Sequence, residues 1–220
     1  MVSPGPASSP RTLRERFLER LARCVLGLAG FGTGIAFFVE ANIGVPPWDV
    51  FHQGISEKTG LGLGTALIVV AFFVLLLWIP LRLRPGIGTI LNAVQIGLVE
   101  NVVQDMLPTP DNLMIRVLFM CLGMLCIAAG SGLYIGAELG SGPRDGLMLG
   151  LNARYGISVR LARTTVEVTV MIIGIFLGGS IGLGTFVFAF GIGPLVQITL
   201  SLFKMSSTQI AEAGAEAQEQ

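Results

Sequence analysis

Charged residues are scarce in this chain. Only 13% of its 220 residues are Asp, Glu, Lys or Arg, and 52% are hydrophobic, whereas a soluble domain carries roughly 25% charged residues. Such a chain cannot cover its own surface with polar groups in water. The 14 basic and 14 acidic residues cancel, so the net charge gives no reason to expect a nucleic-acid partner. The composition therefore predicts an integral membrane protein surrounded by the lipid bilayer.

Residues that hold metals and cofactors are also few. The chain has one histidine, His52, and three cysteines, none of them in a C-x-x-C pair. A single histidine has no neighbours with which to form a metal site, so we interpret His52 as a surface or interfacial side chain and the cysteines as small buried apolar residues. The sequence also contains no phosphate loop, nucleophile triad or nucleotide fingerprint. We therefore expect no metal, no cofactor, no catalytic residue and no enzymatic activity.

Long apolar segments, by contrast, are abundant. A hydrocarbon core of ~30 Å needs about 20 residues of helix, and six segments meet this requirement: 21–39, 63–81, 86–103, 113–137, 161–177 and 183–203. Two further stretches, 47–58 and 143–155, are too short or too polar to cross. The sequence thus predicts an all-α membrane protein with six transmembrane helices and two short helices, which either lie at the interface or re-enter the membrane.

The chain also contains an internal repeat. Residues 27–101 align without gaps with residues 123–197, at an offset of 96, and 19 of the 75 pairs are identical. Many identities are Gly, Pro or Asp, which serve backbone geometry, so similarity between apolar runs does not explain them. Each copy holds three spans, and this odd number makes the second copy enter the membrane from the opposite side. Many secondary transporters share this inverted plan, with their sites near the midplane between the repeats.

This repeat divides the chain into four parts. We expect a disordered cytoplasmic tail at 1–12, a first three-helix repeat at 13–107, a second at 108–204 and a cytoplasmic tail at 205–220. With both termini in the cytoplasm, twelve of the 14 Lys and Arg residues lie inside and only Lys58 and Arg116 lie outside. Basic residues favour the cytoplasmic side, so the distribution supports this orientation.

One motif, Ala-x-φ-Gly-x-x-Pro-x-Asp-x-x-x-x-Gly, occurs at both 41–54 and 137–150. Its first glycine suits the end of a span, where φ > 0 is common, and its proline suits the first turn of a new helix. The aspartate then falls in that first turn, near free backbone N–H groups. In one interpretation the motif is a connector and each aspartate caps its helix. In the other, the two short helices dip toward the midplane and present their N-termini to an anionic or polar substrate.

The two copies of this motif differ in ways that matter for a substrate. Trp48 corresponds to Arg144, and Asn42 corresponds to Glu138. Arg144 suits an anion, although a basic residue on the cytoplasmic side also follows the positive-inside rule. The candidate substrate or gate residues are Asn42, Pro47, Trp48, Asp49, Glu138, Pro143, Arg144 and Asp145.

A second motif, Gly-φ-Gly-Thr, opens the third span of each repeat at 86–89 and 182–185. We interpret it as a tight turn that starts a helix. The threonine hydroxyl either caps that helix or lines a path.

Polar residues inside the predicted spans form a further group of candidates, because ionisable side chains there are rare and functional by default. They are Asn92, Gln95, Glu100, Arg163 and Glu167. Glu167 follows Arg163 by about one turn, which predicts a local ion pair. Glu100 is either an interfacial carboxylate or an intramembrane one. A proton or cation relay through Glu100 or Glu167 is the functional alternative.

Three segments carry a family resemblance. They read Ala-Asn-Ile-Gly-Val-Pro-Pro-Trp-Asp-Val-Phe-His-Gln-Gly at 41–54, Arg-Pro-Gly-Ile-Gly-Thr at 84–89 and Ala-Glu-Leu-Gly-Ser-Gly-Pro-Arg-Asp-Gly-Leu-Met at 137–148. With them the chain resembles the bacterial YczE/YyaS/YitT type of membrane protein from about residue 21 to residue 203. The resemblance implies a multi-pass protein of the bacterial cytoplasmic (inner) membrane. It implies no reaction and no catalytic residue, since such proteins are largely uncharacterised.

The sequence favours a small transporter or permease-like protein of unknown small-molecule substrate. A homodimer is compatible with this function, because six short spans enclose little volume. Two alternatives remain. One is an accessory or scaffold protein that binds another membrane protein and transports nothing. The other is a substrate-capture subunit of a larger transport complex that obtains its energy from a partner ATPase.

Overall fold

The computed structural model describes residues 13–203, and their side chains from residue 17 onward. Within this range the chain forms helices and no strands, which confirms the all-α prediction. The helices are α1 (Leu13–Ala41), α2 (Pro47–Thr59), α3 (Leu63–Leu76), α4 (Trp78–Leu81), α5 (Ile87–Met106), α6 (Leu113–Gly136), α7 (Pro143–Tyr155), α8 (Val159–Leu177) and α9 (Leu183–Phe203). The predicted tails at 1–12 and 205–220 lie outside the described residues.

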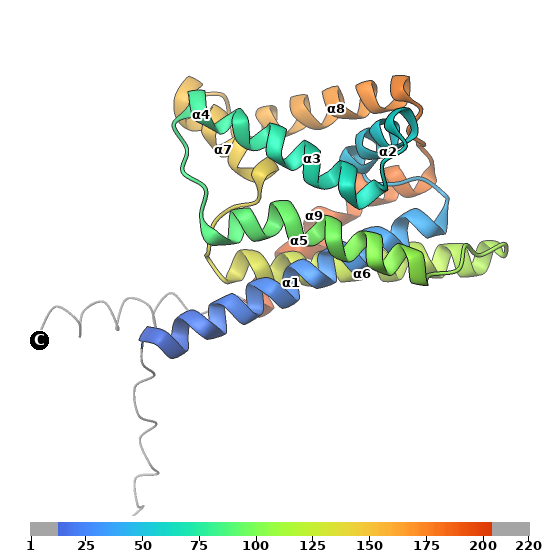
Figure 1. Cartoon of the computed structure of the whole chain (residues 1–220), viewed down its shortest axis with the longest axis horizontal. Coiled ribbons are helices and arrows are strands. Elements are labelled where there is room, and N and C mark those ends of the chain that lie inside the picture. The colour runs from blue at the N-terminus through green and yellow to red at the C-terminus, as the bar shows by residue number, and fades with distance from the viewer. Residues whose placement is uncertain (1–12, 204–220) are drawn as a thin grey trace, which may run out of the picture.

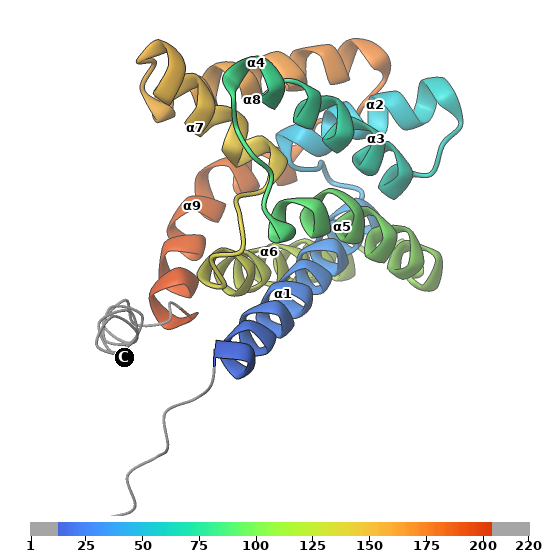
Figure 2. The ribbon, with the colours of Figure 1, turned by 60° about the vertical axis from the view of Figure 1, so that its left-hand side comes forward.

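The helices form two groups that face each other (Figures 1 and 2). In the first group α1 packs along both α5 and α6, and α9 packs on α6. In the second group α2 packs on α8 and α3, while α7 packs on α3, α4 and α8. The crossing of α3 with α5 joins the groups. The short helices α2 and α7 lie toward opposite ends of the molecule in Figure 1.

Four helical segments within the described residues are long and apolar enough to cross a membrane: Phe17–Ala41, Leu63–Leu81, Leu113–Gly136 and Leu183–Phe203. They coincide with four of the six predicted spans. The other two predicted spans form α5 and α8, whose polar side chains, such as Glu100 and Arg163, keep them out of this set. Large apolar side chains point outward, with Phe73, Phe176 and Phe190 exposed by 65%, 84% and 81%. A surface of this kind requires the lipid bilayer as its solvent.

Helix boundaries recur at the offset of the sequence repeat. The pairs α2 and α7, α3 and α8, and α5 and α9 each begin at residues 96 apart. Left-handed backbone recurs at the same offset, at Asn42 and Glu138, Gly44 and Gly140, and Gly60 and Gly156. This conformation is uncommon outside glycine, so its recurrence shows that both copies of the motif make the same turn. The φ > 0 predicted for the first glycine of the motif is thus confirmed at Gly44 and Gly140.

Each half of the chain docks onto the other half through its backbone. The Gly88 N–H donates to the Leu139 carbonyl (2.8 Å), and the corresponding Gly184 N–H donates to the Ile43 carbonyl (2.8 Å). The loop after α6 therefore holds the start of α5, and the loop after α1 holds the start of α9. A side chain at Gly44 would overlap the backbone of Gly182, which explains why these approaches use glycine.

The Gly-φ-Gly-Thr motifs form the predicted helix starts. The Thr89 hydroxyl accepts a hydrogen bond from the Gly86 N–H (3.2 Å), and the Thr185 hydroxyl accepts one from the Gly182 N–H (3.2 Å). The Thr89 hydroxyl also donates to the Ser141 carbonyl (2.8 Å). The two threonines are buried, so they fix the turn and, for Thr89, the contact between halves.

The two halves differ at one helix crossing. α3 packs on α5, and a side chain at Gly64 would overlap the Gly97 carbonyl, just as one at Gly97 would overlap the Gly64 carbonyl. The corresponding helices α8 and α9 make no comparable contact in the described part of the chain. Arg160 occupies the position equivalent to Gly64, and open space surrounds Gly193, the equivalent of Gly97. The α3–α5 crossing in the first half is therefore closely packed, whereas the equivalent helices α8 and α9 in the second half are apart.

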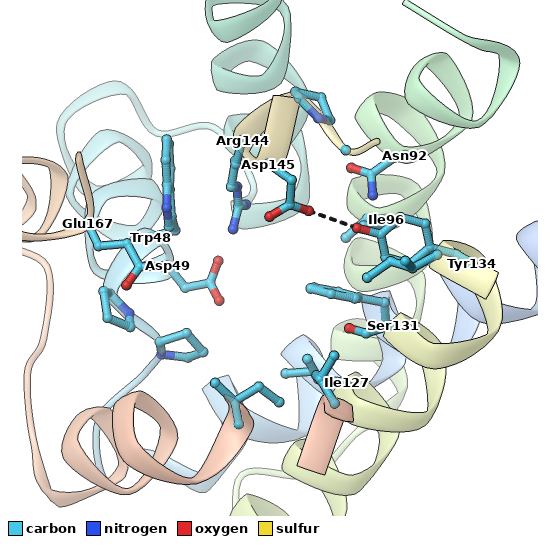
Figure 3. A pocket seen from close by; sticks show the side chains of 18 of the residues that line it. Trp48, Asp49, Asn92, Ile96, Ile127, Ser131, Tyr134, Arg144, Asp145 and Glu167 are labelled. Carbon is cyan, nitrogen blue, oxygen red and sulfur yellow. Dashed lines mark hydrogen bonds between the residues drawn. The ribbon is translucent and has the colours of Figure 1, made fainter. Parts of the chain in front are cut away.

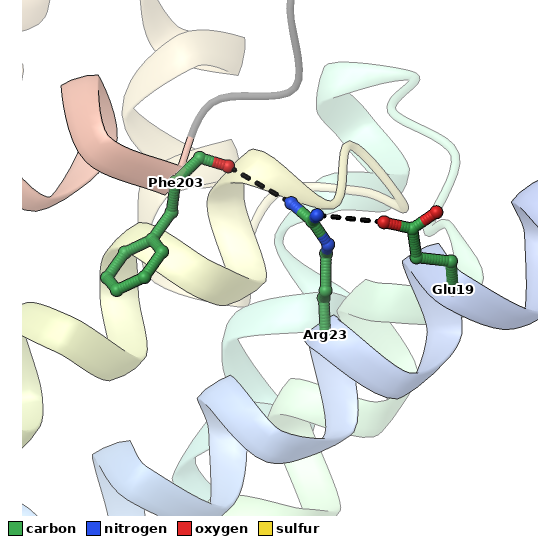
Figure 4. Close-up of polar contacts among 3 residues, drawn as sticks. All are labelled: Glu19, Arg23 and Phe203. Atoms are coloured by element: carbon green, nitrogen blue, oxygen red, sulfur yellow. Dashed lines mark hydrogen bonds and ion pairs between the residues drawn. The ribbon is translucent and has the colours of Figure 1, made fainter. Parts of the chain in front are cut away.

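Arginines near the start of α1 bring three helix ends together. Arg23 pairs with Glu19 (2.8 Å) and donates to the Phe203 carbonyl at the end of α9 (3.4 Å) (Figure 4). One turn earlier, the Arg20 guanidinium donates to the Glu138 carbonyl (2.6 Å), just beyond α6. The first described residues of α1 and the last of α9 consequently lie at the same end of the bundle.

Candidate functional site: a cavity between the short helices

A cavity of about 400 Å³ lies where the N-termini of α2 and α7 approach each other (Figure 3). Its walls include residue pairs at the repeat offset: Pro47 and Pro143, Trp48 and Arg144, Asp49 and Asp145, Ala93 and Ala189, and Ile96 and Ile192. Because both halves contribute equivalent positions, the cavity lies at their junction. This arrangement brings together six of the eight predicted substrate or gate residues.

Both short helices start with proline in the first turn, as predicted, after Pro46 and Gly142. No side chain of either N-cap residue caps the helix. Helix N-termini carry free N–H groups and a partial positive charge. Two such ends therefore bring positive potential to one cavity.

Arg144 is held against the face of Trp48, with its guanidinium carbon 4.8 Å from the ring centroid. This distance is within the range of a cation–π contact. Figure 3 shows the guanidinium beside the ring, facing the same open space as Asp49 and Asp145. Among residues 17–203, Arg144 has no ion pair within 4.0 Å and no hydrogen bond. A guanidinium has five N–H donors, and those of Arg144 are left for whatever fills the cavity.

The two motif aspartates bind side chains and do not cap their helices. Asp49 is buried and its carboxylate contacts His52 Nδ1 (2.9 Å), while Asp145 accepts a hydrogen bond from the Tyr134 hydroxyl (3.0 Å). Neither bonds a backbone N–H of its own helix within the described range. The connector interpretation, in which each aspartate serves only as a cap, does not match this geometry.

His52 is fully buried, so our interpretation of it as a surface or interfacial side chain is wrong. It lies one turn after Asp49 on α2, and the carboxylate draws the ring inward. Burial lowers the pKa of His52, and the hydrogen bond to Asp49 opposes this shift. The hydrogen bond between His52 Nδ1 and Asp49 Oδ1 thus orients the carboxylate of Asp49.

The remaining polar lining comes from α5, α6, α8 and α9, the last of which contributes Gln197. Asn92 and Ser131 face the cavity, and so do Arg163 and Glu167. Arg163 Nε lies 3.0 Å from Glu167 Oε1, which confirms the predicted local pair. Arg144 differs from Arg163 in having no carboxylate within 4.0 Å among residues 17–203, although Asp49 and Asp145 act on it through space.

Four predicted residues are not among those lining the cavity. Asn42 and Glu138 form the left-handed turns before α2 and α7. Gln95 donates to the Val25 carbonyl (2.7 Å) and joins α5 to α1. Glu100 is fully buried on α5, near Gly64 of α3.

Sequence reasoning missed two side chains that shape the site. Tyr134 holds Asp145, and Trp78 donates from its indole N–H to the Pro143 carbonyl (3.0 Å), which fixes the start of α7. Both lie at the repeat offset from apolar or small residues, Phe38 and Gly174. For Tyr134 the sequence did contain a signal: it is a tyrosine in an apolar span whose equivalent in the first repeat is Phe38. A buried tyrosine hydroxyl usually has a hydrogen-bond partner.

The cavity is open on one side. Its lining residues Ala93 and Gly97 on α5 are buried, whereas the equivalent Ala189 and Gly193 on α9 are exposed. Arg163 on α8 is exposed as well. The opening therefore lies between α8 and α9, the pair of helices that do not pack together.

Comparisons with known proteins show the family of this chain. Residues 18–201 match a family of unknown function, DUF6198. The chain belongs to this family. It is 38% identical over 201 residues to an uncharacterized protein of Haemophilus influenzae, covering 91% of this chain and 92% of the relative. It is 32% identical over 190 residues to the uncharacterized membrane protein YczE of Bacillus subtilis, covering 86% and 88%.

A third relative is the uncharacterized protein YyaS of Bacillus subtilis, 24% identical over 165 residues, covering 73% of this chain and 82% of the relative. The resemblance to the YczE and YyaS type is thus confirmed. No solved structure matches the chain. The relatives and the four apolar segments together identify a bacterial membrane protein with several apolar helices.

Proposed function

We propose that this protein is a small transporter that moves a solute with an anionic group through the cavity between α2 and α7. The observation that carries the proposal is Arg144, a partly buried cation that has no ion pair within 4.0 Å among the described residues, although Asp49 and Asp145 act on it through space. A charge removed from water needs a partner. Bidentate binding of a carboxylate or phosphate group would supply one.

The other charged groups of the cavity refine this solute class. Asp49, Asp145 and Glu167 already have donors in His52, Tyr134 and Arg163. The aspartates nevertheless repel a compact polyanion. They favour a solute that pairs its anionic group with an ammonium or hydroxyl group. A volume of about 400 Å³ lies at the lower end of the ≈ 300–1,000 Å³ of typical small-molecule pockets, which fits a small metabolite.

The proposal includes a membrane topology. In it, α1, α3 with α4, α5, α6, α8 and α9 make six spans in two inverted repeats, and α2 and α7 re-enter from opposite faces. Three observations support it: the reciprocal docking of each half on the other, the placement of α2 and α7 toward opposite ends (Figure 1), and the meeting of the start of α1 with the end of α9. We place both termini in the cytoplasm, because that puts most Lys and Arg residues inside.

Transport needs no cofactor or catalytic group in this proposal, and the protein is not an enzyme. The proposal also accounts for polar residues on α5 and α8 that would be unfavourable in contact with lipid. Asn92, Arg163 and Glu167 face the cavity. Ionisable residues of spans commonly face such cavities.

The experiment is uptake by proteoliposomes that contain the purified protein, screened over pools of small metabolites. We expect uptake of solutes with a carboxylate or phosphate group, lost in Arg144→Gln and retained at least in part in Arg163→Gln, because Arg163 already pairs with Glu167. Equal loss in both variants would show that Arg144 has no special role. Binding of such a solute without uptake would instead favour the substrate-capture subunit.

A further inference from the structure

Glu100 is a fully buried carboxyl group that the cavity does not use. It lies on α5 with no exposed surface, and neither of its side-chain oxygens has a hydrogen-bond partner among the described residues. Its neighbour on the helix, Asn101, accepts from the Gly64 N–H (2.9 Å) and donates to the Thr65 hydroxyl (3.2 Å). The donors of α3 closest to this region are therefore already engaged by Asn101.

An ionised Glu100 carboxylate would be a buried negative charge with no hydrogen-bond donor or cation paired with it among the described residues. Burial of a charge without a partner is so unfavourable that the group takes up a proton instead. The charged side chains that act on Glu100 through space are all acidic: Asp49 on α2, Asp105 on α5 and Glu40 on α1. The packed helix α3 contains no titratable residue. Every charged neighbour therefore favours the neutral acid, and the one group that favours the carboxylate, the Gly64 N–H, already donates to Asn101.

The close crossing of α3 and α5 covers this carboxyl group. A side chain at Gly64 would overlap both the Gly97 carbonyl and Glu100, so Glu100 lies directly beneath the contact of the two glycines. The equivalent crossing of α8 and α9 is open. If the two halves exchanged these conformations, as inverted repeats do in alternating access, α3 would part from α5 and expose Glu100 to water.

We propose that Glu100 is a proton-binding site, protonated in the conformation seen here and able to release its proton only when α3 and α5 separate. On release, the O–H bond of the carboxylic acid breaks and the proton passes to water that enters between the helices. Recapture of a proton from water precedes closure. Position 196, the equivalent of Glu100, is valine, so the site exists in one half alone and is open to water in only one of the two conformations.

A role of this proton in driving solute movement rests on the proposed transport function, whereas protonation itself can be measured without any solute. The measurement is infrared spectroscopy of the purified full-length protein in lipid nanodiscs at neutral pH. We compare the wild type with Glu100→Gln, and with Glu167→Gln as the matched control for a half-buried, ion-paired carboxylate. Hydrogen–deuterium exchange of each band reports access to water.

We expect a carboxylic-acid C=O band in the wild type that exchanges slowly in D₂O and is lost in Glu100→Gln. Glu167→Gln should retain this band and lose carboxylate intensity only. Absence of any carboxylic-acid band from the wild type at neutral pH overturns the proposal, and this result needs no variant to fold. Loss of carboxylate intensity in Glu100→Gln overturns it equally. Neither result bears on solute uptake, so failure of this site and failure of the transport function remain distinguishable.

Discussion

The difference between the two helix crossings predicts different effects on stability when the same Gly→Ala substitution is made at two equivalent positions, 97 and 193. In Gly97→Ala, the added Cβ overlaps the Gly64 carbonyl and contacts Ile68. Because the obstacle is backbone, α3 and α5 have to move apart. In Gly193→Ala, the methyl group meets no residue other than its chain neighbours within 4 Å, but the ring of Pro194, which follows within α9, crowds a Cβ at this position.

The magnitudes follow from two opposing effects. Overpacking typically destabilises a core by about 1–3 kcal/mol, and replacing glycine by alanine within a helix stabilises it by about 0.5–1 kcal/mol. Gly97→Ala should thus be destabilising by up to about 2.5 kcal/mol, whereas Gly193→Ala should be close to neutral, because crowding by the ring of Pro194 offsets the gain from alanine. For a domain of this size, 1 kcal/mol shifts Tm by roughly 2–4 °C.

The assay is the fraction of protein that remains monodisperse in gel filtration after heating in detergent, measured over a temperature series. We expect a lower midpoint for Gly97→Ala and a nearly unchanged midpoint for Gly193→Ala. Equal shifts in both variants would refute the reasoning, because they would mean that the two crossings are equally open or equally closed.

Two further predictions concern the contacts that hold the halves and the site. Thr89→Val removes the hydroxyl that joins Gly86 to Ser141 and should be destabilising by about 1–3 kcal/mol. Thr185→Val loses only the hydrogen bond to Gly182 and should lower the unfolding midpoint less. The reverse order of the two midpoints would contradict the assigned contacts. Tyr134→Phe removes the hydrogen bond that holds Asp145, so we expect weaker solute binding in a titration and little change in the unfolding midpoint. Unchanged binding would show that Asp145 does not depend on the Tyr134 hydroxyl.

Much of the fold is predictable from the repeat. Gly, Pro and Asp at fixed offsets determine where helices begin and end, because they act through local backbone geometry. The starts of α2 and α7 at Pro47 and Pro143 and their ends at Gly60 and Gly156 agree with the sequence pattern. Packing between helices is not local in this sense. The closed α3–α5 crossing and the open α8–α9 side therefore could not be predicted.

The site was predictable to the extent that it lies on the duplicated motif. Arg144, Trp48 and the two aspartates were identified as candidates, and the structure brings them to one cavity. Of the partners of those aspartates, His52 was misinterpreted as a surface or interfacial side chain although it follows Asp49 by one turn of α2. Tyr134 was missed because a side-chain contact between α6 and α7 leaves no regular spacing in the sequence. Glu100 was found by its rarity in a span, but only the structure shows that both its oxygens lack a donor.

The central claim is that Arg144 binds the anionic group of a solute, and ligand-induced thermal stabilisation tests it most directly. A solute at 100 times its Kd stabilises the folded protein by about 2.7 kcal/mol, which is a readily measured rise in Tm. We predict that small solutes with a carboxylate or phosphate group raise the Tm of the wild type and of Arg163→Gln, and leave that of Arg144→Gln unchanged. Stabilisation of Arg144→Gln to the same extent as the wild type, or stabilisation of the wild type by cationic solutes alone, would contradict the claim.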